Sequence, residues 1–196
     1  MKIELDATEE KLVSATFDII QREGFKGATT KKIASEAGVN EVTIFRKFEN
    51  KNNLIETTKE YYLQKLLDKL NETFSFTGDE EIIEYLQKTF TSFLDLSDED
   101  FSIIKVAMEE MGGISERRDL ISRITDTILD NFEAYFKIQI EKGAIRDVNP
   151  RVLGTLCYSM TFQSMVLLRV NTTISEDEKL NFGRSYIDIL FNGIKS

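Results

Sequence analysis

A stretch of twenty residues, Thr29 to Phe48, constrains the fold of this chain more than any other segment. It reads TTKKIASEAGVNEVTIFRKF, two short helical patterns on either side of a turn that contains Gly38. Thr29 or Thr30 can cap the first helix, because a hydroxyl oxygen accepts a hydrogen bond from a free backbone N–H. Glycine suits the left-handed residue that often ends a helix, and Asn40 can cap the second helix. The pattern is typical of a helix-turn-helix, whose second helix enters a major groove of DNA.

Apolar residues at helical spacing give the second short helix an inward face and leave polar residues on its other faces. The predicted inward residues are Ile44, Phe45 and Phe48. The residues left on the other faces are Thr43, Arg46 and Lys47.

Around this motif, over roughly residues 8–66, the sequence resembles the TetR/AcrR family of bacterial and archaeal transcriptional regulators. The resemblance rests on many matches at fixed spacing. They are Gly24, Phe25, Thr29, Thr30, Ile33, Ala34, Ala37, Gly38, Val39, Asn40, Thr43, Ile44, Phe45, Phe48, Lys51 and Leu54. Phe45 departs from the family pattern, which usually has a tyrosine there, so a phenolic hydrogen bond to phosphate is missing. Beyond residue 66 only the length and the helical content agree with the family.

The resemblance, position by position, places the DNA contacts in and around the second helix. They fall on Thr30, Lys31, Asn40, Glu41, Val42, Thr43, Phe45, Arg46, Lys47 and Lys51. Thr30 and Lys51 are expected to contact phosphates. Such contacts fix the position of a protein along the DNA duplex but do not distinguish one base sequence from another. The residues expected to reach base edges are Lys31, Glu41, Val42, Arg46 and Lys47. Phosphate repels the carboxylate of Glu41, so the alternative for this residue is that it only caps the helix.

The charge of the chain is divided unevenly along the sequence. The net charge is −9, yet residues 25–51 hold six basic and three acidic residues, a local charge of +3. Attraction to phosphate acts over about a Debye length, roughly 8 Å at physiological salt. The attraction to DNA therefore depends on the local basic patch and not on the net charge of the chain. We expect a basic DNA-binding face on a protein whose remaining surface is acidic. The alternative is that these basic residues form an ordinary solvated helix surface.

The rest of the chain reads as helices, and no strand pattern is found. The predicted helices outside the motif cover about 8–23, 52–76, 82–94, 99–111, 116–142, 150–170 and 175–194. The predicted fold is all-α with about nine helices. Residues 1–51 are expected to form a three-helix DNA-binding domain of the helix-turn-helix type. Residues 52–196 are expected to form a larger helical domain for effector binding and dimerisation.

The segment from Val152 to Val170 is apolar on nearly every side, so it must be buried on more than one side. We expect it to contact both its own core and a second subunit. In the family that the chain resembles, the last two long helices form a four-helix bundle across a two-fold axis. The predicted interface residues are Leu156, Met160, Leu167, Phe182, Tyr186 and Leu190. The alternative is a core helix that is simply well buried.

The larger domain is also expected to contain an effector pocket, because methionine and aromatic side chains line adaptable apolar cavities well. The predicted lining residues are Phe90, Phe93, Phe101, Met108, Met111, Phe132, Phe136, Tyr158, Met160 and Met165. The alternative is that these residues form the core. No cluster of convergent charges indicates a polar or metal ligand, so the expected effector is small and largely apolar.

Several features argue against an enzyme, a metal site and a membrane span. The chain has no histidine and one cysteine, Cys157, so neither an intrachain disulfide nor a structural zinc site is expected. It has no glycine-rich phosphate loop, and the adjacent carboxylates Glu109 and Glu110 point in different directions on a helix. No apolar run approaches 18 residues, and the acidic N-terminus lacks the apolar region of a leader. We expect a cytoplasmic protein without a cofactor.

The sequence therefore favours a ligand-responsive transcriptional regulator, a repressor that binds a palindromic DNA operator as a homodimer and is released by an effector. The alternative is a DNA-binding factor of the same fold without a small-molecule effector, controlled by a protein partner or acting as an architectural factor.

Overall fold

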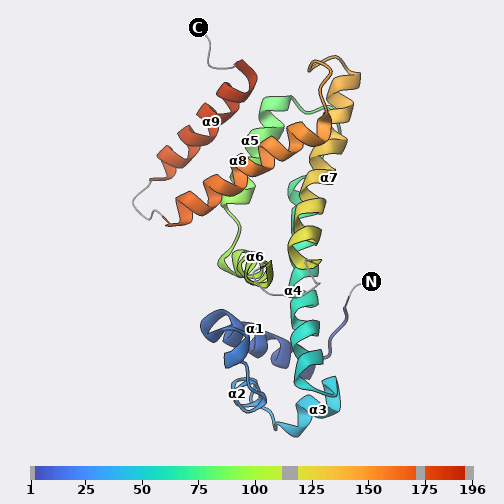
Figure 1. The fold of residues 1–196 in the computed structure, drawn as a ribbon, viewed down its shortest axis with the longest axis vertical. Helices are drawn as coiled ribbons and strands as arrows, with labels where there is room; N and C mark the ends of the chain where they lie inside the picture. The colour runs from blue at the N-terminus through green and yellow to red at the C-terminus, as the bar shows by residue number, and fades with distance from the viewer. Residues whose placement is uncertain (1–2, 112–118, 171–174, 193–196) are drawn as a thin grey trace. The chain divides into compact units, whose positions relative to one another are not determined.

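The structure, a computed structural model, describes residues 3–111, 119–170 and 175–192. Within these ranges the chain forms α-helices and no strand, which confirms the predicted all-α fold (Figure 1). The helices are α1 (Ala7–Gly27), α2 (Thr30–Glu36), α3 (Val42–Phe48), α4 (Lys51–Thr73), α5 (Ile82–Leu94), α6 (Asp98–Met111), α7 (Asp119–Glu141), α8 (Pro150–Val170) and α9 (Glu176–Asn192). The helix limits predicted at residues 112–118 and 193–194 lie outside the described residues.

Two predicted helix ends differ from the structure. The first helix was predicted to end at Gly24, and α1 continues to Gly27. Gly24 nevertheless interrupts the helical geometry, because its φ is 70° and its ψ is 177°. The helix before Thr77 ends at Thr73, because the N–H and the hydroxyl of Ser75 both turn back to the carbonyl of Glu72.

The chain divides into two compact units. The first contains residues 1–67 and 98–121, and the second contains residues 68–97 and 122–196. The boundary after residue 67 falls within α4, and α6 belongs to the unit that contains α1, α2 and α3. The predicted division into a DNA-binding domain (1–51) and an effector-binding and dimerisation domain (52–196) concerns function and not compactness. It stays a prediction.

In the first unit, α1 packs against α2 and α4. The rings of Phe17 and Tyr62 stack with their centroids 3.7 Å apart. The α6 helix joins them, because the hydroxyl of Ser102 donates to the side-chain oxygen of Gln21 at 2.9 Å. The residues of this core that are fully buried are Leu12, Ile19, Ile33, Ile44, Leu54, Leu63 and Leu66. The helix-turn-helix therefore packs against a hydrophobic core that belongs to its own compact unit.

The second unit is built around aromatic side chains from α5, α7 and the end of α4. Tyr85 and Tyr135 stack with ring centroids 3.8 Å apart, and Phe74 meets Phe132 edge-on at 5.0 Å. The two buried phenols are satisfied by carbonyls: Tyr85 donates to Phe74 at 3.0 Å, and Tyr135 donates to Glu80 at 3.0 Å. These hydrogen bonds connect the aromatic core to the turn between α4 and α5.

The α5 helix packs against both α8 and α9 (Figure 1). At one crossing α9 presents Gly183 to the ring of Phe90. A β-carbon on Gly183 would lie 2.6 Å from that ring, which is closer than two carbon atoms can approach. Phe90 is itself buried, so the glycine is what permits this close approach.

Candidate nucleic-acid interface

The two short helices of the motif are capped as the sequence predicts. The hydroxyl of Thr29 accepts from the N–H of Lys32 at 3.3 Å, and the side-chain oxygen of Asn40 accepts from the N–H of Val42 at 3.0 Å. Between them Gly38 has a φ of 67°, the left-handed conformation that glycine adopts without steric cost. The carboxylate of Glu41 makes no capping hydrogen bond, so the cap of α3 is Asn40.

The faces of α3 differ from the prediction at one residue. Ile44 and Phe48, four residues apart, are buried, as predicted. Phe45 was predicted to face inward with them, and this is wrong, because 49% of its surface is exposed. The side chain that follows Ile44 is rotated by about 100° and therefore leaves the buried face. Val42, three residues before Phe45, is 69% exposed. The outer face of α3 is thus partly apolar.

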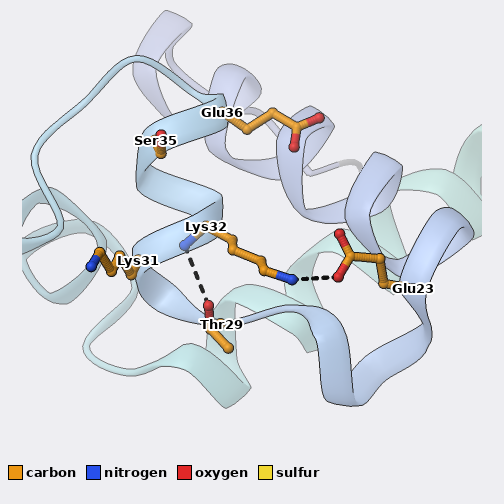
Figure 2. A pocket seen from close by; sticks show the side chains of 6 residues that line it. All are labelled: Glu23, Thr29, Lys31, Lys32, Ser35 and Glu36. Carbon is orange, nitrogen blue, oxygen red and sulfur yellow. Dashed lines mark hydrogen bonds and ion pairs between the residues drawn. The ribbon is translucent and has the colours of Figure 1, made fainter.

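Ion pairs join α2 to α1. The guanidinium of Arg22 holds both oxygens of Glu36, at 2.8 and 2.7 Å, and this pairing lowers the pKa of Glu36. The ammonium of Lys32 pairs with Glu23. Figure 2 shows Lys32 and Glu36 extending toward α1, while Lys31 extends from α2 in the opposite direction. An open groove of about 630 Å³ is lined by Glu23, Thr29, Lys31, Lys32, Ser35 and Glu36.

Lys47 forms ion pairs with the first turn of α1. Its ammonium contacts Oδ2 of Asp6 and lies 3.6 Å from Oε1 of Glu9. The hydrogen bond to Asp6 raises the pKa of Lys47 and lowers that of Asp6. Sequence reasoning treated Lys47 as free to reach a base edge and did not foresee these partners. The available signal was the Asp6-x-x-Glu9 spacing, which is that of a capping box.

The ten predicted DNA-contact residues all lie outside the core. They come from the start of α2, the turn, α3 and the start of α4, and none of them is buried. Lys31 and Arg46 are exposed, and Lys51 is half-buried. Among the residues that the structure describes, no carboxylate forms an ion pair with Lys31, Arg46 or Lys51. These three cations are therefore the ones whose charge is available to a phosphate or a base.

The predicted pocket residues do not all fall in one compact unit. Phe101 and Met108 belong to the first unit, and Met108 is exposed. Phe90, Phe93, Phe132, Phe136 and Met165 are buried in the second unit, where Tyr158 is half-buried and Met160 is exposed. The side chain of Met111 lies outside the described part of the chain. The pocket stays a prediction.

The predicted interface residues also differ in exposure. Leu156, Met160, Leu167 and Phe182 are exposed. Tyr186 is buried instead, with its ring centroid 6.0 Å from that of Phe90, and Leu190 is half-buried. Tyr186 therefore belongs to the packing of α9 on α5.

Other kinds of site would need clustered metal ligands, a long apolar helix or a reactive thiol. Over the described ranges, no group of three or more histidine, cysteine or acidic side chains is placed to hold a metal ion. None of the described helices is long and apolar enough to span a membrane. Cys157 is buried, and burial raises the pKa of its thiol to about 11. This cysteine is therefore a protonated packing residue at neutral pH.

Comparison with known proteins gives a family match at the site itself. Residues 12–58 match the model of bacterial regulatory proteins of the tetR family. The chain is 26% identical over 155 residues to an uncharacterized HTH-type transcriptional regulator of Bacillus subtilis, YvkB, with 79% of each chain covered. It is 21% identical over 190 residues to the fatty acid metabolism regulator protein of the same organism, with 94% of each covered.

A solved structure has the same fold. The transcriptional regulator FadR from Bacillus subtilis, determined in complex with stearoyl-CoA, is 19% identical to this chain and has a TM-score of 0.66. The match covers 95% of this chain and 99% of that one. The family match coincides with the capped helix pair described above. Residues 12–58 therefore form a helix-turn-helix domain of the tetR family of bacterial regulatory proteins, in a chain whose described residues are all-α.

Proposed function

We propose that this protein is a ligand-responsive repressor that binds a near-palindromic operator as a homodimer in the cytoplasm and leaves it when an effector with a long apolar chain binds. The observation that carries the proposal is the outer face of α3. There the exposed side chains of Val42, Phe45 and Arg46 lie in a segment flanked by the unpaired cations Lys31 and Lys51. A recognition helix needs such a face, with groups for base edges and cations for the backbone.

Each exposed group suits a different part of the DNA. Arg46 can hold a guanine through two hydrogen bonds, and Val42 can contact the methyl group of a thymine. Glu41 can accept from the amino group of a cytosine, and its freedom from capping supports that role. Phe45 has no hydroxyl, so its contribution is an apolar contact. Thr30 and Lys51 are proposed to contact phosphates.

Arg46→Ala is expected to weaken binding to the operator by about 1–3 kcal/mol, because a bidentate base contact is lost. The measurement is the Kd for an operator duplex selected from a random pool by the wild-type protein, compared with a scrambled duplex at the same salt concentration. Arg184→Ala, an exposed arginine of α9 in the other compact unit, is the matched control. Equal losses on the operator and on the scrambled duplex would demote Arg46 to a phosphate contact.

An exposed apolar stripe supports the proposed dimer. On α8, Val152, Leu156, Met160 and Leu167 are between 43% and 56% exposed, at spacings that place them on one face of the helix. On α9, Phe182 and Ile189, seven residues apart, are also exposed. Apolar patches of this kind mark interaction surfaces. A second copy of the chain, covering this stripe across a two-fold axis, would bury it.

For the effector we propose a long-chain acyl-CoA. Two observations support this ligand class. One relative is named as a regulator of fatty acid metabolism, and one protein of the same fold was solved with stearoyl-CoA. The second unit of this chain is rich in aromatic side chains, which suit an acyl chain. The alternative remains a DNA-binding factor of this fold controlled by a protein partner.

Stearoyl-CoA is expected to bind more weakly when the protein is saturated with operator DNA. Coupling between two sites is reciprocal, so a hundredfold loss of DNA affinity, about 2.7 kcal/mol, must appear as the same loss for the ligand. The measurement is the Kd of stearoyl-CoA with and without saturating operator, and coenzyme A without an acyl chain is the control. Equal values would show that stearoyl-CoA is not an inducer and would favour the alternative.

A further inference from the structure

Lys47 differs from the other cations of the recognition region because two carboxylates already hold it. Its ammonium contacts Asp6 and lies 3.6 Å from Glu9, and its side chain is only 26% exposed. Lys31, Arg46 and Lys51 have no such partners among the described residues. A cation with two carboxylate partners sits in a site of net negative charge. DNA phosphates therefore gain little attraction from Lys47 as long as these pairs persist.

The two carboxylates are held in place by the capping box of α1. Oδ1 of Asp6 accepts from the N–H groups of Thr8 and Glu9, both at 2.9 Å, while Oδ2 faces Lys47. Oε2 of Glu9 accepts from the N–H of Asp6 at 2.8 Å, while Oε1 faces Lys47. Each carboxylate thus uses one oxygen for the helix and the other for the lysine. Their positions do not depend on Lys47, so they form a preorganised site for its ammonium.

Lys47 also lines a groove with two more carboxylates, of which Glu56 is itself paired with Lys59 at 2.9 Å. The groove, of about 350 Å³, is lined by Lys47, Phe48, Glu49, Asn53, Glu56 and Thr57. Asp6 and Lys47 are 41 residues apart in the sequence, so their pairing joins α3 to α1. The pairs therefore constrain the recognition helix against the first helix of its own unit.

We propose that Lys47 is a positioning residue for the recognition helix, and that Asp6 and Glu9 withhold its charge from DNA phosphates. The proposal rests on the proposed DNA-binding function and adds a specificity device to it. Sequence-independent affinity comes almost entirely from phosphate contacts. Keeping one cation per subunit away from DNA phosphates lowers that sequence-independent affinity. The ion pairs at the same time hold α3 in its orientation, on which the base contacts depend.

The first test is the salt dependence of binding to a random-sequence duplex. Each phosphate contact contributes about 0.9 to the slope of log K against log salt, so a residue that contributes one contact per subunit adds about 1.8 in a dimer. Lys47→Gln is expected to leave this slope unchanged. Lys51→Gln, the matched control at a proposed phosphate contact, is expected to lower it by about 1.8. Equal losses of slope for the two variants would overturn the proposal.

The second test removes the two charges and keeps the capping box. Asn caps a helix as well as Asp, and Gln can replace Glu in a capping box. Asp6→Asn/Glu9→Gln is therefore expected to bind the random duplex more tightly, with a slope steeper by about 1.8. Adding Lys47→Gln should cancel both changes. An unchanged slope in the double variant would overturn the proposal.

Controls separate this device from general effects of charge and folding. Glu4→Gln/Glu10→Gln makes the same charge change with two exposed residues that do not pair with Lys47, and its slope should match that of the wild type. On the selected operator, Lys47→Gln should lose affinity and Lys47→Arg should retain it, because arginine can keep both ion pairs. If the wild-type protein selects no operator and binds no duplex, the proposed function fails, and this inference fails with it.

Discussion

Leu156→Asp is expected to convert the proposed dimer into a folded monomer and to abolish binding to the palindromic operator. Leu156 is 54% exposed in the chain described here, so the substitution puts no charge into the core of its own subunit. In a two-fold interface the substitution occurs twice, and two carboxylates are then buried in an apolar contact without partners. Such an interface is expected to bury more than roughly 2,000 Å² in total.

The measurement is sedimentation equilibrium at micromolar concentration, with circular dichroism to check that helices are retained. Ile83→Asp is the matched control, because Ile83 on α5 is also an exposed apolar residue, at 49%, and is not part of the stripe. It should leave the dimer intact. A wild-type protein that sediments as a monomer, or a Leu156→Asp variant that remains a dimer, would contradict the proposed interface.

Phe132→Ala is expected to destabilise the protein by about 3–5 kcal/mol, the usual cost of removing a large aromatic side chain from a core. Phe132 is 1% exposed, and its ring meets those of Phe74, Tyr85 and Phe136 with centroids 5.0 to 6.2 Å apart. Removal of the ring would leave a cavity, and the neighbouring rings on several sides would lose their van der Waals contacts with Phe132. The measurement is the free energy of unfolding from urea denaturation, with Ile83→Ala as the exposed control.

The same variant separates the two interpretations of the aromatic residues. If Phe132 is a core residue only, the affinity for stearoyl-CoA in conditions where the variant is folded should equal that of the wild type. If it lines the effector pocket, that affinity should fall as well. A loss of stability no larger than that of Ile83→Ala would contradict the core assignment.

The parts of the molecule that follow from local chemistry were predictable from the sequence. The cap residues Thr29 and Asn40 and the turn at Gly38 act on neighbours within three residues, so their spacing was sufficient to identify the helix-turn-helix. The long helices were recognisable because an apolar side chain recurs on one face at each turn. Their number and order agree with the structure over the described ranges.

The errors concern contacts between distant residues. The partners of Lys32 and Lys47 lie nine and 41 residues away, so a charge count over residues 25–51 included lysines that are already paired. Phe45 and Tyr186 were judged by side-chain type. Their burial depends instead on which face of the helix meets the core, and hydrophobicity alone does not determine that. The assignment of α6 to the unit of the helix-turn-helix likewise rests on tertiary contacts such as that of Ser102 with Gln21.

The close approach of Gly183 to Phe90 bears on the register of α9 along α5. If α9 slid by one turn, Ile187 would take the place of the glycine, and a branched side chain cannot enter a space that has no room for a single β-carbon. The contact therefore opposes this shift of α9 along α5. In the proposed dimer Phe182 and Ile189 of α9 belong to the shared surface. The position that Gly183 permits for α9 along α5 would therefore also set where these two side chains meet the second subunit.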